Sequence, residues 1–142
     1  MSDYLLIPKD ERQDIIDDIK KVLLKKEEVV FSFLHGSFLA DPSFRDIDIA
    51  IYVKGIDEEK VFDYELKLSE SLAEKTNLSF DIFDVKVLNF APSPFLNNIF
   101  RNGKLLFSKD KEFLSDMIEK TSLEAISNEF IAYQSLRDLV PA

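Results

Sequence analysis

Residues 33–53 read FLHGSFLADPSFRDIDIAIYV, and this stretch decides the fold. A strand-like segment ends at Gly36, the chain turns, and a second strand begins around Asp46. Side chains alternate along a strand, so Asp46 and Asp48 are expected on one face and the neighbouring isoleucines on the other. Two carboxylates about 7 Å apart on one face suit hard divalent ions that are bridged by phosphate oxygens. The stretch therefore predicts metal-dependent nucleotidyl transfer.

The turn between these two strands is a candidate nucleotide-binding loop. Gly36 and Ser37 come before a short helix that we expect to end ahead of Pro42, and the N-terminus of a helix binds anions. A triphosphate could lie there, although a plain turn with a capping serine is the alternative. Arg45 could bind the triphosphate through its forked donors or remain a solvated loop charge. His35, the only histidine, is either a nucleotide contact or structural.

The chain has the composition of a folded, acidic protein. Its 142 residues, 46% of them hydrophobic and 13 of them Phe, are enough for one domain spanning residues 1–142. The net charge of −9 disfavours binding to free nucleic acid unless the basic residues cluster. The absence of Cys excludes disulfides and thiolate metal sites. Because no signal peptide and no apolar run of about 20 residues is visible, we expect a soluble, cytoplasmic protein without a membrane segment.

Hydrophobic periodicity predicts the order of the helices and strands. Helices are expected at residues 10–26, 57–75, 95–101 and 111–140, the last of them with a break near residues 121–122. Strands are expected at residues 29–34, 47–53, 78–85 and 104–107. This order predicts an α/β fold in which the helices pack against one mixed sheet.

The third of these strands carries two more acidic residues. If residues 78–85 form a strand, Asp81 and Asp84 point to opposite faces, because successive side chains alternate. Only one of the two can therefore face the site formed by Asp46 and Asp48.

Two segments of the chain resemble the minimal nucleotidyltransferases of the DNA polymerase beta superfamily. The signature of that family is Gly-Ser, a short spacer and Asp-x-Asp, which is similar to Gly36-Ser37 followed by Asp46-Ile47-Asp48 here. The segment RNGKLLF at residues 101–107 looks like a hairpin that follows in the family. The similar stretches run from about residue 33 to 53 and from about residue 79 to 110. The resemblance implies a single-domain, polymerase beta-like fold.

The resemblance also implies a metal site and a substrate. It implies ATP as the substrate and two Mg²⁺ ions held by Asp46, Asp48 and a third carboxylate on the neighbouring strand. By the family pattern the third catalytic and metal-binding residue is Asp81, with Asp84 as the alternative. The residues expected to bind the nucleotide are Gly36, Ser37 and Arg45.

Minimal nucleotidyltransferases are commonly paired with a helical HEPN protein in a toxin–antitoxin module. The resemblance thus implies transfer of AMP from ATP to a hydroxyl of a HEPN-type partner, with this chain as the antitoxin. Two alternatives remain open at this point. One is a non-catalytic module that neutralises a partner by binding, because the loop around Phe38 and Arg45 departs from the family pattern. The other is transfer to a small, aminoglycoside-like molecule, which would need extra helical walls or a homo-oligomer.

Overall fold

The computed structural model describes residues 5–36, 38, 43–44 and 46–139. Its centre is a four-stranded mixed sheet in the order β5-β4-β2-β6. The strands are β2 (Val29–His35), β4 (Ile47–Val53), β5 (Phe83–Val87) and β6 (Lys104–Ser108). β2 runs antiparallel to both β4 and β6, whereas β4 and β5 are parallel. A separate two-stranded sheet pairs β1 (Leu5–Leu6) with β3 (Ser43–Phe44).

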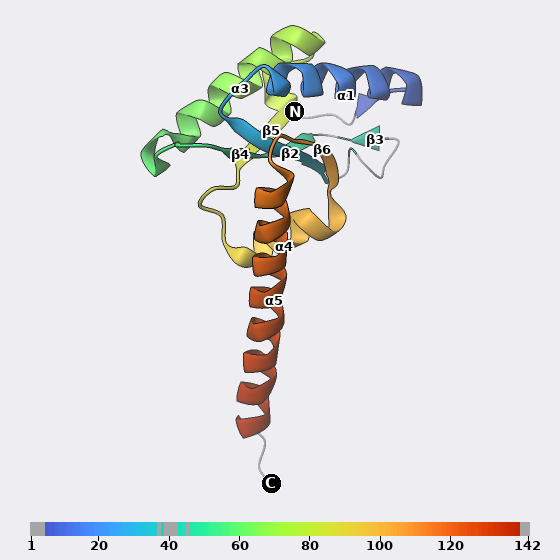
Figure 1. Cartoon of the computed structure of the whole chain (residues 1–142). Helices are drawn as coiled ribbons and strands as arrows, with labels where there is room; N and C mark the ends of the chain where they lie inside the picture. The colour runs from blue at the N-terminus through green and yellow to red at the C-terminus, as the bar shows by residue number, and fades with distance from the viewer. Residues whose placement is uncertain (1–4, 37, 39–42, 45, 140–142) are drawn as a thin grey trace.

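Two helices cover one face of the central sheet (Figure 1). They are α1 (Lys9–Leu24) and α3 (Val61–Thr76), and the short 3-10 helix η1 (Glu58–Lys60) leads into α3. The apolar stripe of each helix faces the sheet, as the helical spacing of the sequence predicts. The buried residues between the helices and the sheet include Ile15, Ile19, Leu23, Ile47, Ile49, Ile51, Leu68 and Leu72.

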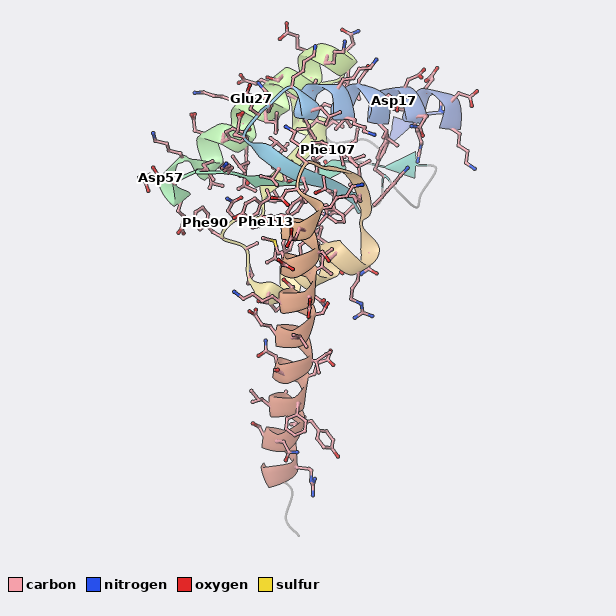
Figure 2. The ribbon with its side chains drawn as sticks, in the orientation of Figure 1. Asp17, Glu27, Asp57, Phe90, Phe107 and Phe113 are labelled. Carbon is pink, nitrogen blue, oxygen red and sulfur yellow. The ribbon has the colours of Figure 1, made fainter. Side chains whose placement is uncertain are left out.

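The opposite face of the sheet packs against α4 (Ser93–Asn102) and the first turns of α5 (Lys111–Leu139). Its core is aromatic, with Phe31 fully buried and its ring 5.6 Å from the ring of Tyr52. Phe113 at the base of α5 lies over Tyr52, with ring centroids 4.9 Å apart, and Figure 2 shows its position between helix and sheet. The sheet is therefore buried on both faces, which explains the nearly continuous apolar sequences of β2 and β4.

The predicted α/β class with one mixed sheet is confirmed. β2, β4 and β6 lie where the periodicity predicts them, as do the helices around the sheet. The predicted break near residues 121–122 is wrong, because α5 continues through Thr121, which is buried against the body of the protein. At its start, the Asp110 carboxylate caps α5 by accepting a hydrogen bond of 3.0 Å from the backbone N–H of Phe113.

The predicted strand at residues 78–85 is also wrong in its register. Asn77 ends α3 in the left-handed conformation (φ 59°), and the chain then forms a 3-10 helix, η2 (Phe80–Ile82), before β5 begins at Phe83. Pairing with β4 decides this register, because it buries the alternating apolar residues Phe83, Val85 and Val87. Asp81 consequently lies outside the strand.

The short helix predicted after Gly36 lies mostly outside the described residues. Phe38 is described and is 3% exposed in the core. The guanidinium of Arg12 lies 5.5 Å from the centre of the Phe38 ring, and its Nη1 donates a 3.2 Å hydrogen bond to the Phe38 carbonyl oxygen. Phe38 is thus a core anchor of the loop. None of the helices in the described ranges combines the length and apolarity that a membrane span requires.

Candidate active site

Three polar side chains form a row across the sheet where β2 ends and β4 begins. His35 of β2 is paired in register with Asp48 of β4, and Asp48 is paired with Asp84 of β5. Neighbouring strands are about 4.8 Å apart, so these three side chains lie next to one another at the same end of the sheet. Asp46 immediately precedes β4 and is half-buried, as is Asp48. The fold therefore gathers the predicted Asp46 and Asp48 with Asp84, and we call these three carboxylates the acidic row.

Asp48 is the carboxylate most affected by this arrangement. Its pKa is raised from 3.8 to about 6, first by burial and then by the negative charges of Asp84 and Asp46. A hydrogen bond between the carboxyls of Asp48 and Asp84 raises the pKa in the same direction, whereas the nearby Lys86 ammonium lowers it. The site thus concentrates negative charge that a cation would stabilise.

Gly36 permits the end of β2 to come close to Asp48. Its φ of +80° lies in the region that side chains other than glycine rarely adopt. A Cβ atom at this position would overlap Oδ2 of Asp48 and lie 3.1 Å from Cγ. The predicted loop glycine therefore lies directly against the metal-ligand candidate, with its backbone beside the carboxylate.

His35 contributes a buried polar atom to the same row. Its Nε2 is buried and has no hydrogen-bond partner among the described residues. Burial lowers the pKa of His35, Asp84 raises it and Lys86 lowers it again. The ring also packs edge-on against Phe95 of α4, with centroids 6.2 Å apart. Burial thus favours the neutral imidazole at neutral pH. His35 has a structural role in packing against α4 and also lies next to the acidic row.

Lys86 is a residue of the site that sequence reasoning missed. It follows Asp84 by two positions on β5, so both side chains point to the same face, and its Nζ lies 3.6 Å from Oδ1 of Asp84. Both side chains are about half exposed, which makes this a weak surface ion pair. The alternation of Asp84 and Lys86 along the correct strand register is the signal that would have identified it.

The other predicted site residues are not all brought together. Asp81 lies in η2 and is exposed, so the pairing of β4 with β5 places Asp84, not Asp81, opposite Asp48. Ser37 and Arg45 lie outside the described residues. The geometry therefore favours Asp84 as the candidate for the third metal ligand, which was the alternative to Asp81 in the sequence analysis.

The donor set suits a hard divalent cation, since it consists of carboxylate oxygens that repel one another. Within the described ranges, however, no group of three or more His, Cys, Asp or Glu side chains is already gathered closely enough to hold an ion. Binding would therefore require the carboxylates to turn towards a common point, which half-buried side chains at the end of a strand can do.

The chain matches the family model described as "Polymerase beta, Nucleotidyltransferase" over residues 17–112. These residues include β2, the loop, β4 and β5, which carry the whole acidic row. The chain therefore belongs to the polymerase beta nucleotidyltransferase family, and it is a nucleotidyltransferase by class. No match was found among curated proteins.

Solved structures share the fold. One belongs to the complex of tri-AMPylated Shewanella oneidensis HEPN toxin with MNT antitoxin; the match has 20% identity and a TM-score of 0.62 over 89% of this chain and 96% of that chain. A second is a toxin–antitoxin structure with AMP-PNP, with 20% identity and a TM-score of 0.63 over 87% and 95% of the two chains. A third, from Shewanella oneidensis, has 18% identity and a TM-score of 0.55 over 93% and 97%. At these identities the similarity establishes the fold.

Proposed function

We propose that this protein transfers AMP from ATP to a hydroxyl group of a HEPN-type protein partner and acts as the antitoxin of that partner. The observation that carries the proposal is the row of Asp46, Asp48 and Asp84 beside the backbone of Gly36, in a chain of the nucleotidyltransferase family. The neighbours described as toxin–antitoxin complexes, one with a tri-AMPylated HEPN toxin and one with AMP-PNP, support the acceptor and the nucleotide.

The roles follow from the positions of the side chains. We assign two Mg²⁺ ions to Asp46, Asp48 and Asp84, whose mutual repulsion a divalent cation would relieve. When bound, the metal ions would neutralise the charge of the triphosphate and of the leaving pyrophosphate. Gly36 leaves room beside its backbone for the Asp48 carboxylate, and Gly36, Ser37 and Arg45 stay proposed nucleotide contacts on the basis of sequence.

The reaction balances without further reactants. The acceptor oxygen forms a bond to the α-phosphorus of ATP, the bond from that phosphorus to the bridging oxygen breaks, and pyrophosphate leaves. The proton of the acceptor hydroxyl passes to a carboxylate, and Asp84 is our candidate because it lies at the more exposed end of the row.

The third carboxylate can be tested with a matched pair of variants. Asp84→Asn should lower AMP transfer at least about 100-fold, because it removes a ligand and proton acceptor. Asp81→Asn, which changes an exposed carboxylate three residues earlier, should stay within about threefold of wild type. The measurement is incorporation of labelled AMP into a HEPN-type protein from the same genome, with Mg²⁺ and ATP present. The reverse ranking would return the role to Asp81.

The non-catalytic alternative depended partly on the unusual loop residue Phe38. Since Phe38 is buried in the core, its departure from the family pattern anchors the loop and leaves the acidic row intact. Neutralisation of the partner without any incorporated AMP would favour the binding module, and labelling of an aminoglycoside in place of a protein would favour the small-molecule enzyme.

A further inference from the structure

The second half of α5 is a helix that leaves the body of the protein. Figure 1 shows α5 extending beyond the sheet and α4, and Figure 2 shows side chains on all sides of its last turns with no other element beside them. Its base is fixed to the body by the buried Thr121 and by a hydrogen bond that Ser93 Oγ donates to the carboxylate of Glu124. We call residues 119–139 of α5, which include this anchored base, the arm.

The arm carries an apolar seam, which helical periodicity places on the side opposite the buried Thr121. Leu123, Ile126, Phe130 and Tyr133 are 58%, 63%, 62% and 59% exposed. Their spacing of three, four and three residues places them on one stripe, as at the a and d positions of a coiled coil. Exposure of four large apolar side chains in one stripe to water is unfavourable, and burial of the stripe against another helix would be favourable.

We infer that the arm pairs antiparallel with the arm of a second copy of this chain. In an antiparallel pair, a positions lie beside d positions of the partner helix. One register places Leu123 beside Tyr133 and Ile126 beside Phe130 of the other copy, so that all four layers of the seam are apolar. No apolar seam residue then remains unmatched.

Charge selects this orientation. The seam position one step before Leu123 is Glu119, and the position one step after Tyr133 is Arg137; both are exposed. In the antiparallel register, Arg137 of each copy lies opposite Glu119 of the other, so the seam closes with opposite charges at both ends. A parallel pair would instead oppose Glu119 to Glu119 and Arg137 to Arg137.

The area of the seam is sufficient for a weak dimer. Four side chains of ~200 Å² each, about three-fifths exposed, offer about 500 Å² per copy, and pairing therefore removes about 1,000 Å² from water. That is the lower limit for a specific interface, where weak and transient complexes lie, so we expect a dimer that dissociates in the micromolar range, about 1–100 µM. Because the two arms run in opposite directions, the two catalytic domains would lie at opposite ends of the dimer.

The first test is sedimentation equilibrium of the full chain between about 1 and 200 µM, a range that brackets the expected constant. Wild type should pass from monomer to dimer. Phe130→Ser should remain monomeric, whereas the control Ile131→Ser, at a residue that is 61% exposed but off the seam, should dimerise like wild type. Both positions are exposed on the arm, so the circular dichroism of the body should not change.

The second test concerns orientation. Arg137→Glu should weaken the dimer at least about fivefold, Glu119→Arg should do the same, and the double variant should recover wild-type affinity. A monomeric wild type at the highest concentration, unchanged dimerisation of Phe130→Ser, or an unaffected Arg137→Glu dimer would each overturn the proposal. A chain that is monomeric alone and loses only its binding to a HEPN-type protein in Phe130→Ser would assign the seam to that partner instead.

Discussion

Two glycines with nearly the same positive φ allow the role of Gly36 to be separated from simple strain. Gly36 has a φ of +80° and Gly55 a φ of +76°. A Cβ on Gly55 would meet no atom within 4 Å, whereas a Cβ on Gly36 would overlap Oδ2 of Asp48. Alanine at either position has the same backbone penalty, but only Gly36→Ala displaces the carboxylate.

The expected magnitudes differ for stability and for activity. Each variant should lose about 1–2 kcal/mol of unfolding free energy, since a left-handed φ destabilises alanine by that amount. The overlap with Asp48 adds little, because the end of a side chain can swing away. That movement, however, shifts a metal-ligand candidate by about 1 Å or more, and a misplacement of this size lowers the rate about 100-fold.

The assay combines urea unfolding with AMP transfer to the proposed HEPN-type partner. We expect Gly36→Ala and Gly55→Ala to unfold within about 1 kcal/mol of each other and to differ about 100-fold in rate. Equal transfer rates would refute the reasoning, because Asp48 would then tolerate displacement and could not be a ligand held by this loop. A much larger loss of stability in Gly36→Ala would show instead that Asp48 cannot move.

Two further predictions concern Asp48 and the metal. Because burial and like charges raise the pKa of Asp48, its contribution to stability is fully present below about pH 4 and is lost as the pH rises through about 6. In metal-free protein, the free energy of unfolding of Asp48→Asn relative to that of wild type should therefore rise by about 1–2 kcal/mol from about pH 4 to about pH 8, as measured by urea unfolding. This figure is lower than the full pKa shift implies, because solvent screens a half-buried group. An equal difference between the two proteins at both pH values would contradict the prediction. Millimolar Mg²⁺ with ATP should raise the melting temperature of wild type by several degrees and leave that of Asp48→Asn unchanged, and a wild-type melt indifferent to both would argue for the non-catalytic module.

The strands β2 and β4, which place Gly36, Asp46 and Asp48, were predictable because their sequences permit one arrangement. β4 alternates so that a one-residue shift would bury Asp48 in the core beside α1 and α3. β2 is apolar on both faces and ends at a glycine with positive φ. Local sequence therefore determines where Gly36 and Asp48 lie, and the close approach between them follows from the pairing of His35 with Asp48.

β5 was not predictable in the same way, since its sequence permits two registers. Residues 78–85 alternate plausibly with either Asp81 or Asp84 facing the site. The choice is made by non-local pairing with β4, which aligns Phe83 with Ile47 and leaves Phe80–Ile82 as a 3-10 turn. The arm shows the same limit, because helical periodicity predicts a helix through Leu123 but does not reveal that the contacts of this helix with the body end near Glu124.

The acidic row itself is unfavourable in the metal-free fold. Asp48 is half-buried beside two carboxylates, and the only cation that the described residues bring to the row in an ion pair is the weakly held ammonium of Lys86. A purely structural strand end would be more stable with an apolar or amide residue at Asp48, since burying a carboxylate among like charges is destabilising. The arrangement would become favourable if these oxygens shared the proposed divalent cation. The electrostatics of the row therefore support catalysis more directly than a binding role, for which Asp48 would have no use.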